Sequence, residues 1–134
     1  MTNLRWYGDR VMREFEGLMM RNVTEAGHHL AREVKLSMQR KGRTGKKHPA
    51  YEPSLPGEPP AVQTGILRSA IGSESGKDTL GPVARVGPRT VQKGKSTKSA
   101  RFLEFGTRKM KARPYLRPAV AKNKGEIARI LAKT

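Results

Sequence analysis

The sequence feature that most constrains the fold is a run of apolar residues at spacings of three and four near the N-terminus. These residues are Val11, Phe15, Leu18, Met19, Val23, Ala26, Leu30, Val34 and Met38. Such spacing places apolar side chains on one face of an α-helix, so it predicts one long amphipathic helix over residues 1–41. If this helix is continuous from Arg5 to Arg40, it is about 54 Å long at a rise of about 1.5 Å per residue.

A helix of this length is too long to be covered by the rest of so small a chain. The sequence has 134 residues, which predicts a single domain over residues 1–134, and a compact domain of that size has a radius of gyration of roughly 14 Å. Only 35% of the residues are hydrophobic and 5% aromatic, so we expect a thin core. Either the helix bends near Gly17 or Gly27, or a neighbouring subunit covers the overhang. The second alternative predicts self-association.

The middle of the chain predicts short elements joined by a loop. Residues 42–63 are rich in proline and glycine and predict a long loop. Thr64 precedes a short helical stripe of apolar residues and can cap it. The segment from Leu80 to Val86 is bracketed by glycine and proline and predicts a strand, with Ile71 to Ser75 as its antiparallel partner.

The last third of the chain predicts a loop, an apolar anchor and a terminal helix. Residues 90–99 are mainly Lys, Gly, Ser and Thr, which predicts an exposed, flexible loop. Residues 100–105 are mostly apolar, and Gly106 then supplies the backbone freedom for a turn. The predicted apolar face of the terminal helix comprises Leu116, Val120, Ile127 and Leu131. Residues 64–134 thus hold a small antiparallel sheet with a short helix, a basic loop and a C-terminal helix, and the fold class is α+β.

The charge is strongly positive and unevenly distributed. The chain has 28 Lys and Arg against 11 Asp and Glu, a net charge of +17, of which residues 68–134 contribute +13. Self-repulsion of this size favours a polyanionic partner. The candidates to face DNA are Lys93, Lys95 and Lys98, together with Arg40, Lys41, Arg43, Lys46 and Lys47 at the start of the proline-rich loop. Alternatively, these charges are simply solvated, or they pair with acids on neighbouring subunits.

Several classes of function lack the residues they need. The chain has no cysteine, which excludes thiolate chemistry. His28 and His29 are adjacent and point about 100° apart on a helix, so they do not chelate one metal. The glycines of residues 72–77 lack the spacing of a phosphate-binding loop, and the carboxylates are scattered. No apolar run approaches the roughly 20 residues of a membrane span. We therefore expect no enzyme activity, no metal, no cofactor and no membrane partner.

Two segments resemble a known protein family. The first is residues 59–71, which read PPAVQTGILRSAI. The second combines residues 100–107, which read ARFLEFGT, with residues 112–119, which read ARPYLRPA. In this order and separation they resemble the tail-completion (neck, head-tail joining) proteins of long-tailed double-stranded DNA phages. Gln63 stands where that family often has Arg, and Tyr115 stands where it usually has Phe.

The resemblance implies a non-enzymatic assembly protein, in a ring of six subunits at the head-proximal end of the tail. The implied partners are further copies of the chain, a tail-terminator or tail-tube protein, a head-closure protein and the double-stranded DNA that passes through the lumen. The implied location is the neck of the virion, and the host cytoplasm during assembly. The rival hypothesis depends on charge alone, and it is a free nucleic-acid-binding accessory protein without sequence specificity.

The second of the two motif elements is expected to be structural. On the family resemblance, we expect Glu104 to pair with Arg113 and to fix the turn at Gly106. Pro114 is tolerated because it falls before the first turn of the terminal helix. The residues expected to anchor that helix to the sheet are Phe102, Phe105, Tyr115 and Leu116.

Overall fold

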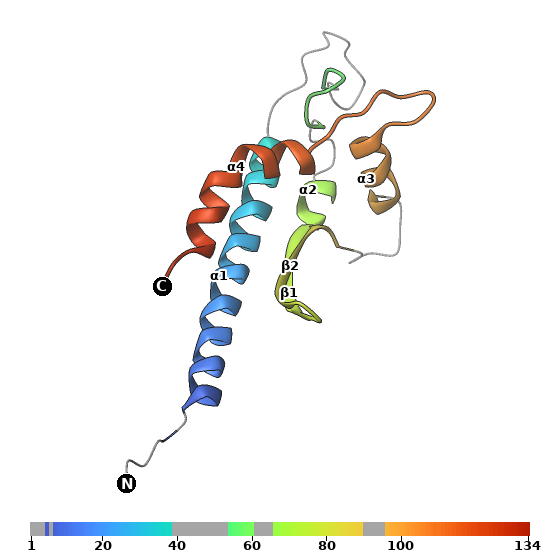
Figure 1. Cartoon of the computed structure of the whole chain (residues 1–134). Coiled ribbons are helices and arrows are strands. Elements are labelled where there is room, and N and C mark those ends of the chain that lie inside the picture. Colours follow the sequence, from blue (N-terminus) through green and yellow to red (C-terminus); the bar gives the residue numbers. More distant parts are fainter. Residues whose placement is uncertain (1–4, 6, 39–53, 61–65, 90–95) are drawn as a thin grey trace.

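The chain folds into an α+β architecture, which confirms the predicted fold class. The computed structural model describes residues 5, 7–38, 54–60, 66–89 and 96–134, and the side chains of residues 66 and 96–99 fall outside that description. The elements are α1 (Gly8–Ser37), α2 (Ile66–Ala70), β1 (Ile71–Asp78), β2 (Gly81–Pro88), α3 (Ser96–Phe105) and α4 (Leu116–Leu131). Figure 1 shows α1 as a long rod, with α4 on one side of it, the β1–β2 hairpin on the other, and α3 beyond the hairpin.

The N-terminal helix α1 is one unbroken helix of 30 residues. The alternative of a bend near Gly17 or Gly27 is therefore wrong, because both glycines lie inside this continuous helix. Their surroundings differ, because a Cβ added at Gly17 would meet open space, whereas one added at Gly27 would overlap Ser73 Oγ and lie 2.9 Å from Ala84 Cβ. Gly27 is thus a position where the hairpin packs directly on the helix backbone.

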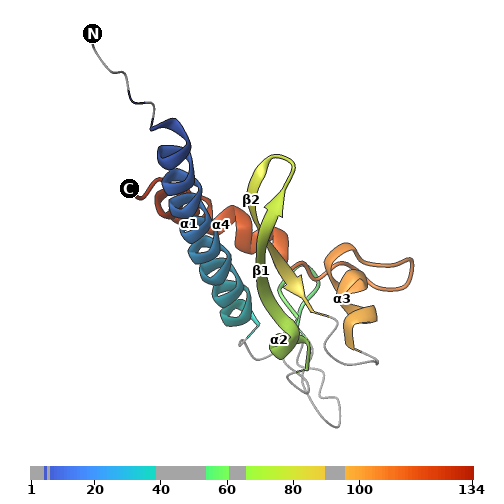
Figure 2. The same ribbon diagram turned by 90° about the horizontal axis from the view of Figure 1, so that it is seen from below.

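The strands β1 and β2 form an antiparallel hairpin, as predicted. Ile71 pairs with Pro88 at the open end, and Asp78 pairs with Gly81 at the turn. Both strands have eight residues, so each is longer than the predicted segment. Pro82 fits inside β2 because a two-stranded sheet leaves each strand one edge on which no partner needs an N–H donor. Figure 2 shows the hairpin alongside α1.

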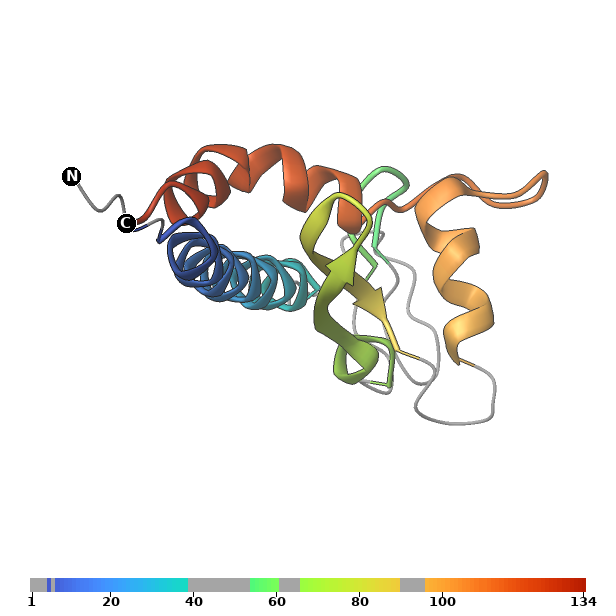
Figure 3. The ribbon, with the colours of Figure 1, turned by 60° about the horizontal axis from the view of Figure 1, so that its bottom comes forward.

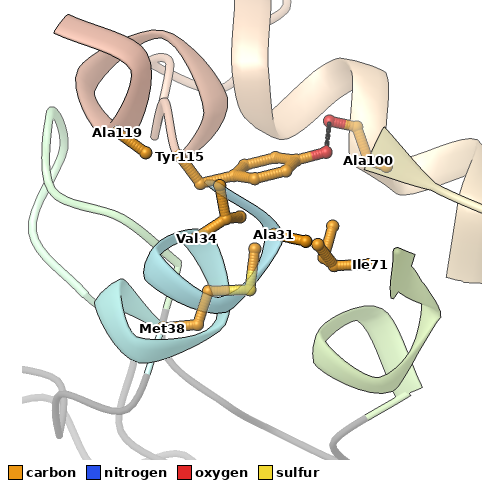
Figure 4. Packing of buried hydrophobic residues seen from close by; sticks show 7 residues of the cluster. All are labelled: Ala31, Val34, Met38, Ile71, Ala100, Tyr115 and Ala119. Carbon is orange, nitrogen blue, oxygen red and sulfur yellow. Dashed lines mark hydrogen bonds between the residues drawn. The ribbon is translucent and has the colours of Figure 1, made fainter. Parts of the chain in front are cut away.

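A small core joins α1 to the hairpin, α3 and the start of α4. It comprises Ala31, Val34, Met38, Ile71, Ala100, Tyr115 and Ala119. Val34 and Tyr115 are 0% and 1% exposed, and Figure 4 shows the Tyr115 ring between Val34 and the Ala100 end of α3. Because three of these seven residues are alanines, the elements approach closely and the core is thin.

The C-terminal end of α4 is held against the middle of α1. Asn22 Nδ2 donates hydrogen bonds to the carbonyl oxygens of Leu131 (3.3 Å) and Lys133 (2.7 Å). The Lys133 ammonium also pairs with the Glu25 carboxylate. Asn22 therefore supplies partners for carbonyls that a helix end leaves unsatisfied. As a result, the cover that α4 provides ends near Asn22.

The buried face of α4 differs from the predicted one. Ala119 and Ile130 are buried, whereas Val120 and Leu131, which were expected to face the core, are exposed. The reason is that Tyr115, which is fully buried and directly precedes the first residue of α4, sets the rotation of the helix. Ala119 follows four residues later on the same side, and its small side chain allows α4 to pack closely on α1.

The structure of α3 corrects two further predictions. The helix begins at Ser96, so its first turn replaces the end of the predicted flexible loop. Phe102 and Phe105 are 51% and 64% exposed, so they lie outside the core and do not anchor the terminal helix to the sheet as predicted. The inward positions of α3 belong to Ala100 and Glu104, both buried, because the carboxylate of Glu104 has partners on the inside.

Candidate interaction surfaces

Glu104 is a buried acid in the strongly basic half of the chain. It lies on α3, and its carboxylate reaches the N-terminus of α4. Oε2 accepts hydrogen bonds from the backbone N–H groups of Tyr115 at 2.8 Å and Leu116 at 3.1 Å. Oε1 accepts a hydrogen bond from the backbone N–H of Arg117 at 3.0 Å. A carboxylate carried by α3 thus caps the N-terminus of the next helix, α4.

This cap accounts for the N–H groups at the start of α4. A helix leaves its first four N–H groups without an intrahelical partner. Three of them bind Glu104, and the fourth position is Pro118, which has no N–H. The residue at the N-cap, Tyr115, makes no side-chain cap bond, and the first turn has no acid of its own. The carboxylate charge is also favourable at the positive end of the helix dipole.

Arg117, and not Arg113, is the ion-pair partner of Glu104. Arg117 Nε lies 3.3 Å from Glu104 Oε1, and the Arg117 guanidinium carbon lies 4.7 Å from the centroid of the Phe105 ring. Arg113 instead donates its backbone N–H to the Leu103 carbonyl at 2.7 Å. The predicted pair is wrong because Arg113 lies in the segment that closes the turn, whereas Arg117 lies in the first turn of α4, beside the carboxylate.

The sequence contains a signal for this cap that is independent of the family resemblance. Glu104 is the sole acid between Asp78 and Glu126. The helix that begins at Leu116 has neither an acid nor a capping side chain in its first turn. A lone acid shortly before an uncapped helix indicates that the acid serves as the cap.

The charge states at this junction are fixed by its surroundings. Burial raises the pKa of the Glu104 carboxyl, but the three backbone N–H donors and the Arg117 side chain outweigh burial and hold the pKa below its ordinary value of 4.5. Burial and the nearby Glu104 charge raise the pKa of Tyr115 to about 12. The Tyr115 hydroxyl therefore stays protonated, and it donates a hydrogen bond to the Ala100 carbonyl at 3.2 Å (Figure 4).

The chain between α3 and α4 makes a tight turn at the predicted glycine. Gly106 has a φ of 75°, and a Cβ there would lie 2.9 Å from Ala112 N and 3.0 Å from Met110 O. Only glycine fits this position without strain. The Ala112 carbonyl also accepts a hydrogen bond from the Gly57 N–H at 2.9 Å, which ties residues 54–60 of the predicted loop to this turn.

The outer surface of α3 combines exposed aromatic rings with cations. Phe102 and Phe105 project from the helix, and we name these two residues the α3 patch. The exposed cations of the same segment are Arg101, Arg108, Lys109, Lys111 and Arg117. Aromatic residues and arginine are enriched in protein interfaces, so this surface is suited to a macromolecular partner.

The N-terminal half of α1 exposes a row of apolar side chains. The row follows one face of the helix at intervals of four residues, and we name it the α1 patch. It consists of Tyr7, Val11, Phe15 and Met19. Val11 and Phe15 are 58% and 53% exposed. Among the described elements none covers this row, because α4 ends near Asn22. The overhang expected from the helix length is therefore present.

A third feature is an open cavity of about 510 Å³ between α1, α2 and β1. Its titratable lining residues are all basic or imidazole groups, namely His28, Arg32, Lys35 and Arg89. The Arg89 guanidinium also donates a hydrogen bond to the Ser73 carbonyl. Such a lining suits a phosphate or carboxylate, but it holds no nucleophile beside a base.

Most of the predicted DNA-facing residues lie outside the described residues. These are Arg40, Lys41, Arg43, Lys46, Lys47, Lys93 and Lys95. Thr64, the predicted cap of α2, also lies outside them, and Lys98 is described only in its backbone, as part of α3. Within the described ranges, no three His, Asp or Glu side chains gather as metal ligands, and no helix has the length and apolarity to cross a membrane.

Comparison of the chain with protein-family models, with curated proteins and with solved structures gives no match. The case for a function therefore depends on the two patches, the capped junction and the charge of the chain.

Proposed function

We propose that this chain is a structural protein of a phage or prophage neck. In this proposal, copies of the chain form a ring at the head-proximal end of the tail and help to join the tail to the head around the DNA channel. The observation that carries the proposal is the α1 patch, an apolar row that the described part of the chain leaves uncovered. A continuous exposed apolar surface is typical of an interaction site, so a second subunit is its natural cover.

The resemblance to tail-completion proteins gains support from the roles of the residues that carry it. Glu104 caps α4, Gly106 makes the turn, and Tyr115 fills the core. Each of these residue types follows from the fold, and none is placed beside a reactive partner. A motif with only structural roles favours an assembly protein over an enzyme.

The proposal is tested by following the protein from solution into particles. Negative-stain electron microscopy of the concentrated protein should show rings with a central opening. When mixed with tails and DNA-filled heads that lack this protein, it should restore joined particles and remain bound to them through gradient purification. A chain that stays out of both rings and particles would refute the proposal.

A second candidate function is sequence-nonspecific binding of nucleic acid by the free protein. The observation that favours it is the excess of exposed cations after α3, together with the basic lining of the cavity beside α1. Cations that contact phosphates release condensed counterions, which gives binding that weakens steeply with salt. On this candidate, the charge itself is the function.

The two candidates respond differently to loss of the predicted DNA-facing lysines. If the free protein binds nucleic acid, replacing Lys93, Lys95 and Lys98 with Ala should weaken duplex binding and lower the slope of affinity against salt by about 1 for each lost phosphate contact. If the chain is a neck protein, the same variant should still restore joined particles. Titration of labelled duplex DNA at several salt concentrations provides the measurement.

A further inference from the structure

The two exposed apolar patches lie at opposite ends of the molecule. The α1 patch is on the N-terminal end of the long helix, and the α3 patch is on the element farthest from it. Figures 1 to 3 show this separation from three directions. Patches so far apart do not form one continuous binding surface. Each is instead available to a separate partner, or to the other patch on a second molecule.

The segments that carry the patches differ in charge. Residues 8–25 hold four acids against three arginines, which makes this segment slightly acidic in a chain of net charge +17. Residues 101–117 hold six cations against one acid, Glu104, and that acid is buried under the start of α4. Electrostatic attraction therefore favours contact between the two segments and opposes contact of the α3 segment with itself.

The acids of the α1 segment are free to change partners. Glu14 pairs with Arg10, and Glu16 pairs with Lys77. In both ion pairs, the acidic and the basic side chain are each about half or more exposed. Exposed ion pairs of this kind contribute roughly 0 to 1 kcal/mol each and are readily exchanged. Cations arriving with another molecule can thus bind these carboxylates at little cost.

We infer that the α3 patch of one copy docks on the α1 patch of the next copy. The contact is head-to-tail: two different surfaces meet, so the two end copies of a growing row each keep one free patch until the row closes into a ring. Phe102 and Phe105 act as aromatic anchors on the row that contains Val11 and Phe15, with cations around the anchors facing the acids of α1. This inference deepens the proposed function and rests on its premise that copies of the chain associate.

Complementation between two broken surfaces tests the inference. One variant carries Val11→Ser and Phe15→Ser, and the other carries Phe102→Ser and Phe105→Ser. All four side chains are more than half exposed, so both variants should keep the fold, which circular dichroism checks. The control is Leu80→Ser, at a hairpin-tip side chain that is 97% exposed and outside both patches.

Sedimentation velocity over a range of concentrations should distinguish the five samples, which are the wild type, the control, each double variant alone and the mixture of the two. The wild-type chain and the control should form complexes larger than dimers, and each double variant alone should associate at least about tenfold more weakly. An equimolar mixture of the two double variants should form a heterodimer and stop there, because each variant contributes one intact patch. Two variants that fail alone and associate together are expected only of a contact between unlike surfaces.

A cross-linking experiment on nearly unchanged protein provides an independent check. The chain has no cysteine, so single cysteines mark single sites. A Met12→Cys copy mixed with an Arg101→Cys copy should give a mixed cross-linked dimer with a short bismaleimide. Each copy alone should give little, because the same site does not meet itself across the contact.

Other results would overturn the inference in recognisable ways. If only the α1 variant loses association and mixing gives no rescue, the α1 patch pairs with itself or with a different surface. If the wild-type chain stays monomeric and no mixed cross-link forms, copies do not meet through these patches. In either case the neck function is judged separately, by whether the wild-type protein restores joined particles.

Discussion

The two halves of α1 have the same amphipathic pattern and opposite surroundings. In the C-terminal half, Val34 is fully buried under the start of α4 and beside the hairpin, whereas in the N-terminal half Phe15 is 53% exposed. The spacing of apolar residues is similar in both halves. An apolar helix face therefore predicts that something will cover it, but not whether the cover belongs to the same molecule.

The two glycines of α1 repeat this contrast at the backbone. Gly27 is in the covered half, where an added Cβ would collide with the hairpin, whereas Gly17 is in the uncovered half, where an added Cβ would meet no atom within 4 Å. The covered half of α1 is thus packed so closely that no room remains for one added carbon atom at Gly27, whereas the uncovered half has open space at Gly17.

Removing the Glu104 cap should weaken the packing of α4 on the C-terminal half of α1. In Glu104→Ala, three N–H groups at the start of α4 lose their acceptor, so the free energy of unfolding should fall by about 3 kcal/mol. Glu126→Ala is the matched control, because Glu126 forms an exposed pair with Arg129 on the same helix, and it should cost less than about 0.5 kcal/mol. Urea denaturation measures both. Equal losses in the two variants would show that Glu104 is not the cap that holds α4.

Truncation of one apolar side chain in each half measures the difference directly. Val34→Ala leaves a cavity in the core and should lower the free energy of unfolding by about 2 kcal/mol. Phe15→Ala should change the free energy of unfolding of the monomer by less than about 0.5 kcal/mol, because the ring is more than half exposed. Thermal denaturation at low concentration provides the measurement. A loss at Phe15 as large as that at Val34 would mean that the first half of α1 is covered within the monomer.

Alanine at the two glycines should shift stability in opposite directions. Gly17→Ala should raise the free energy of unfolding by about 1 kcal/mol, because alanine is the better helix former and its Cβ meets no atom. Gly27→Ala should lower it by about 1–3 kcal/mol, because its Cβ would collide with Ser73 and Ala84. Denaturant midpoints of both variants check the signs. A stabilising Gly27→Ala would mean that the hairpin does not pack on α1.

Loss of the Tyr115 hydroxyl should have a smaller effect. Tyr115→Phe keeps the buried ring and removes one hydrogen bond to the Ala100 carbonyl, so the expected loss is about 1 kcal/mol. The comparison variant is Tyr7→Phe, in the uncovered half, where the side chain is exposed and no change is expected. The difference between the two unfolding free energies isolates the hydroxyl in the covered region.

The pH dependence linked to Glu104 should be the smallest effect, because burial opposes the hydrogen bonds that lower its pKa. A lowered pKa in the folded state means that the ionised carboxylate adds stability above its ordinary pKa of 4.5 and that this stability is lost as the pH falls through the folded value. The denaturant midpoint of the wild type should therefore decrease as the pH is lowered below about 4.5. The part of this decrease that is due to Glu104 should be absent in Glu104→Gln. A Glu104→Gln curve parallel to that of the wild type would exclude the linkage.

The overall fold was predictable because local signals are strong in this chain. The apolar row of α1 and the glycine and proline brackets of the hairpin indicate their elements without reference to the rest of the molecule. The need for glycine at position 106 was equally local, since it depends on one backbone turn. The start of α3 was not predictable, because its first turn has no apolar periodicity.

The errors concern residues whose orientation depends on distant partners. Phe102 and Phe105 look like anchors in sequence, but the inward positions of α3 are taken by Ala100 and by Glu104, whose partners come from α4. Likewise, the rotation of α4 follows from the burial of Tyr115, and periodicity alone does not reveal it. Both errors have one cause: the rotation of each helix is set by a buried residue whose partner lies on the other helix or at its start, Glu104 for α3 and Tyr115 for α4.

The shared carboxylate of Glu104 also has a mechanical consequence. Both carboxylate oxygens accept hydrogen bonds at the start of α4, so a force that displaces α3 is transmitted to α4. Because α4 packs on α1, the force also reaches α1. In a closed ring of such subunits, displacement of one member would strain the whole circle. Rigidity of the assembly would then depend on a side chain that is buried inside each subunit.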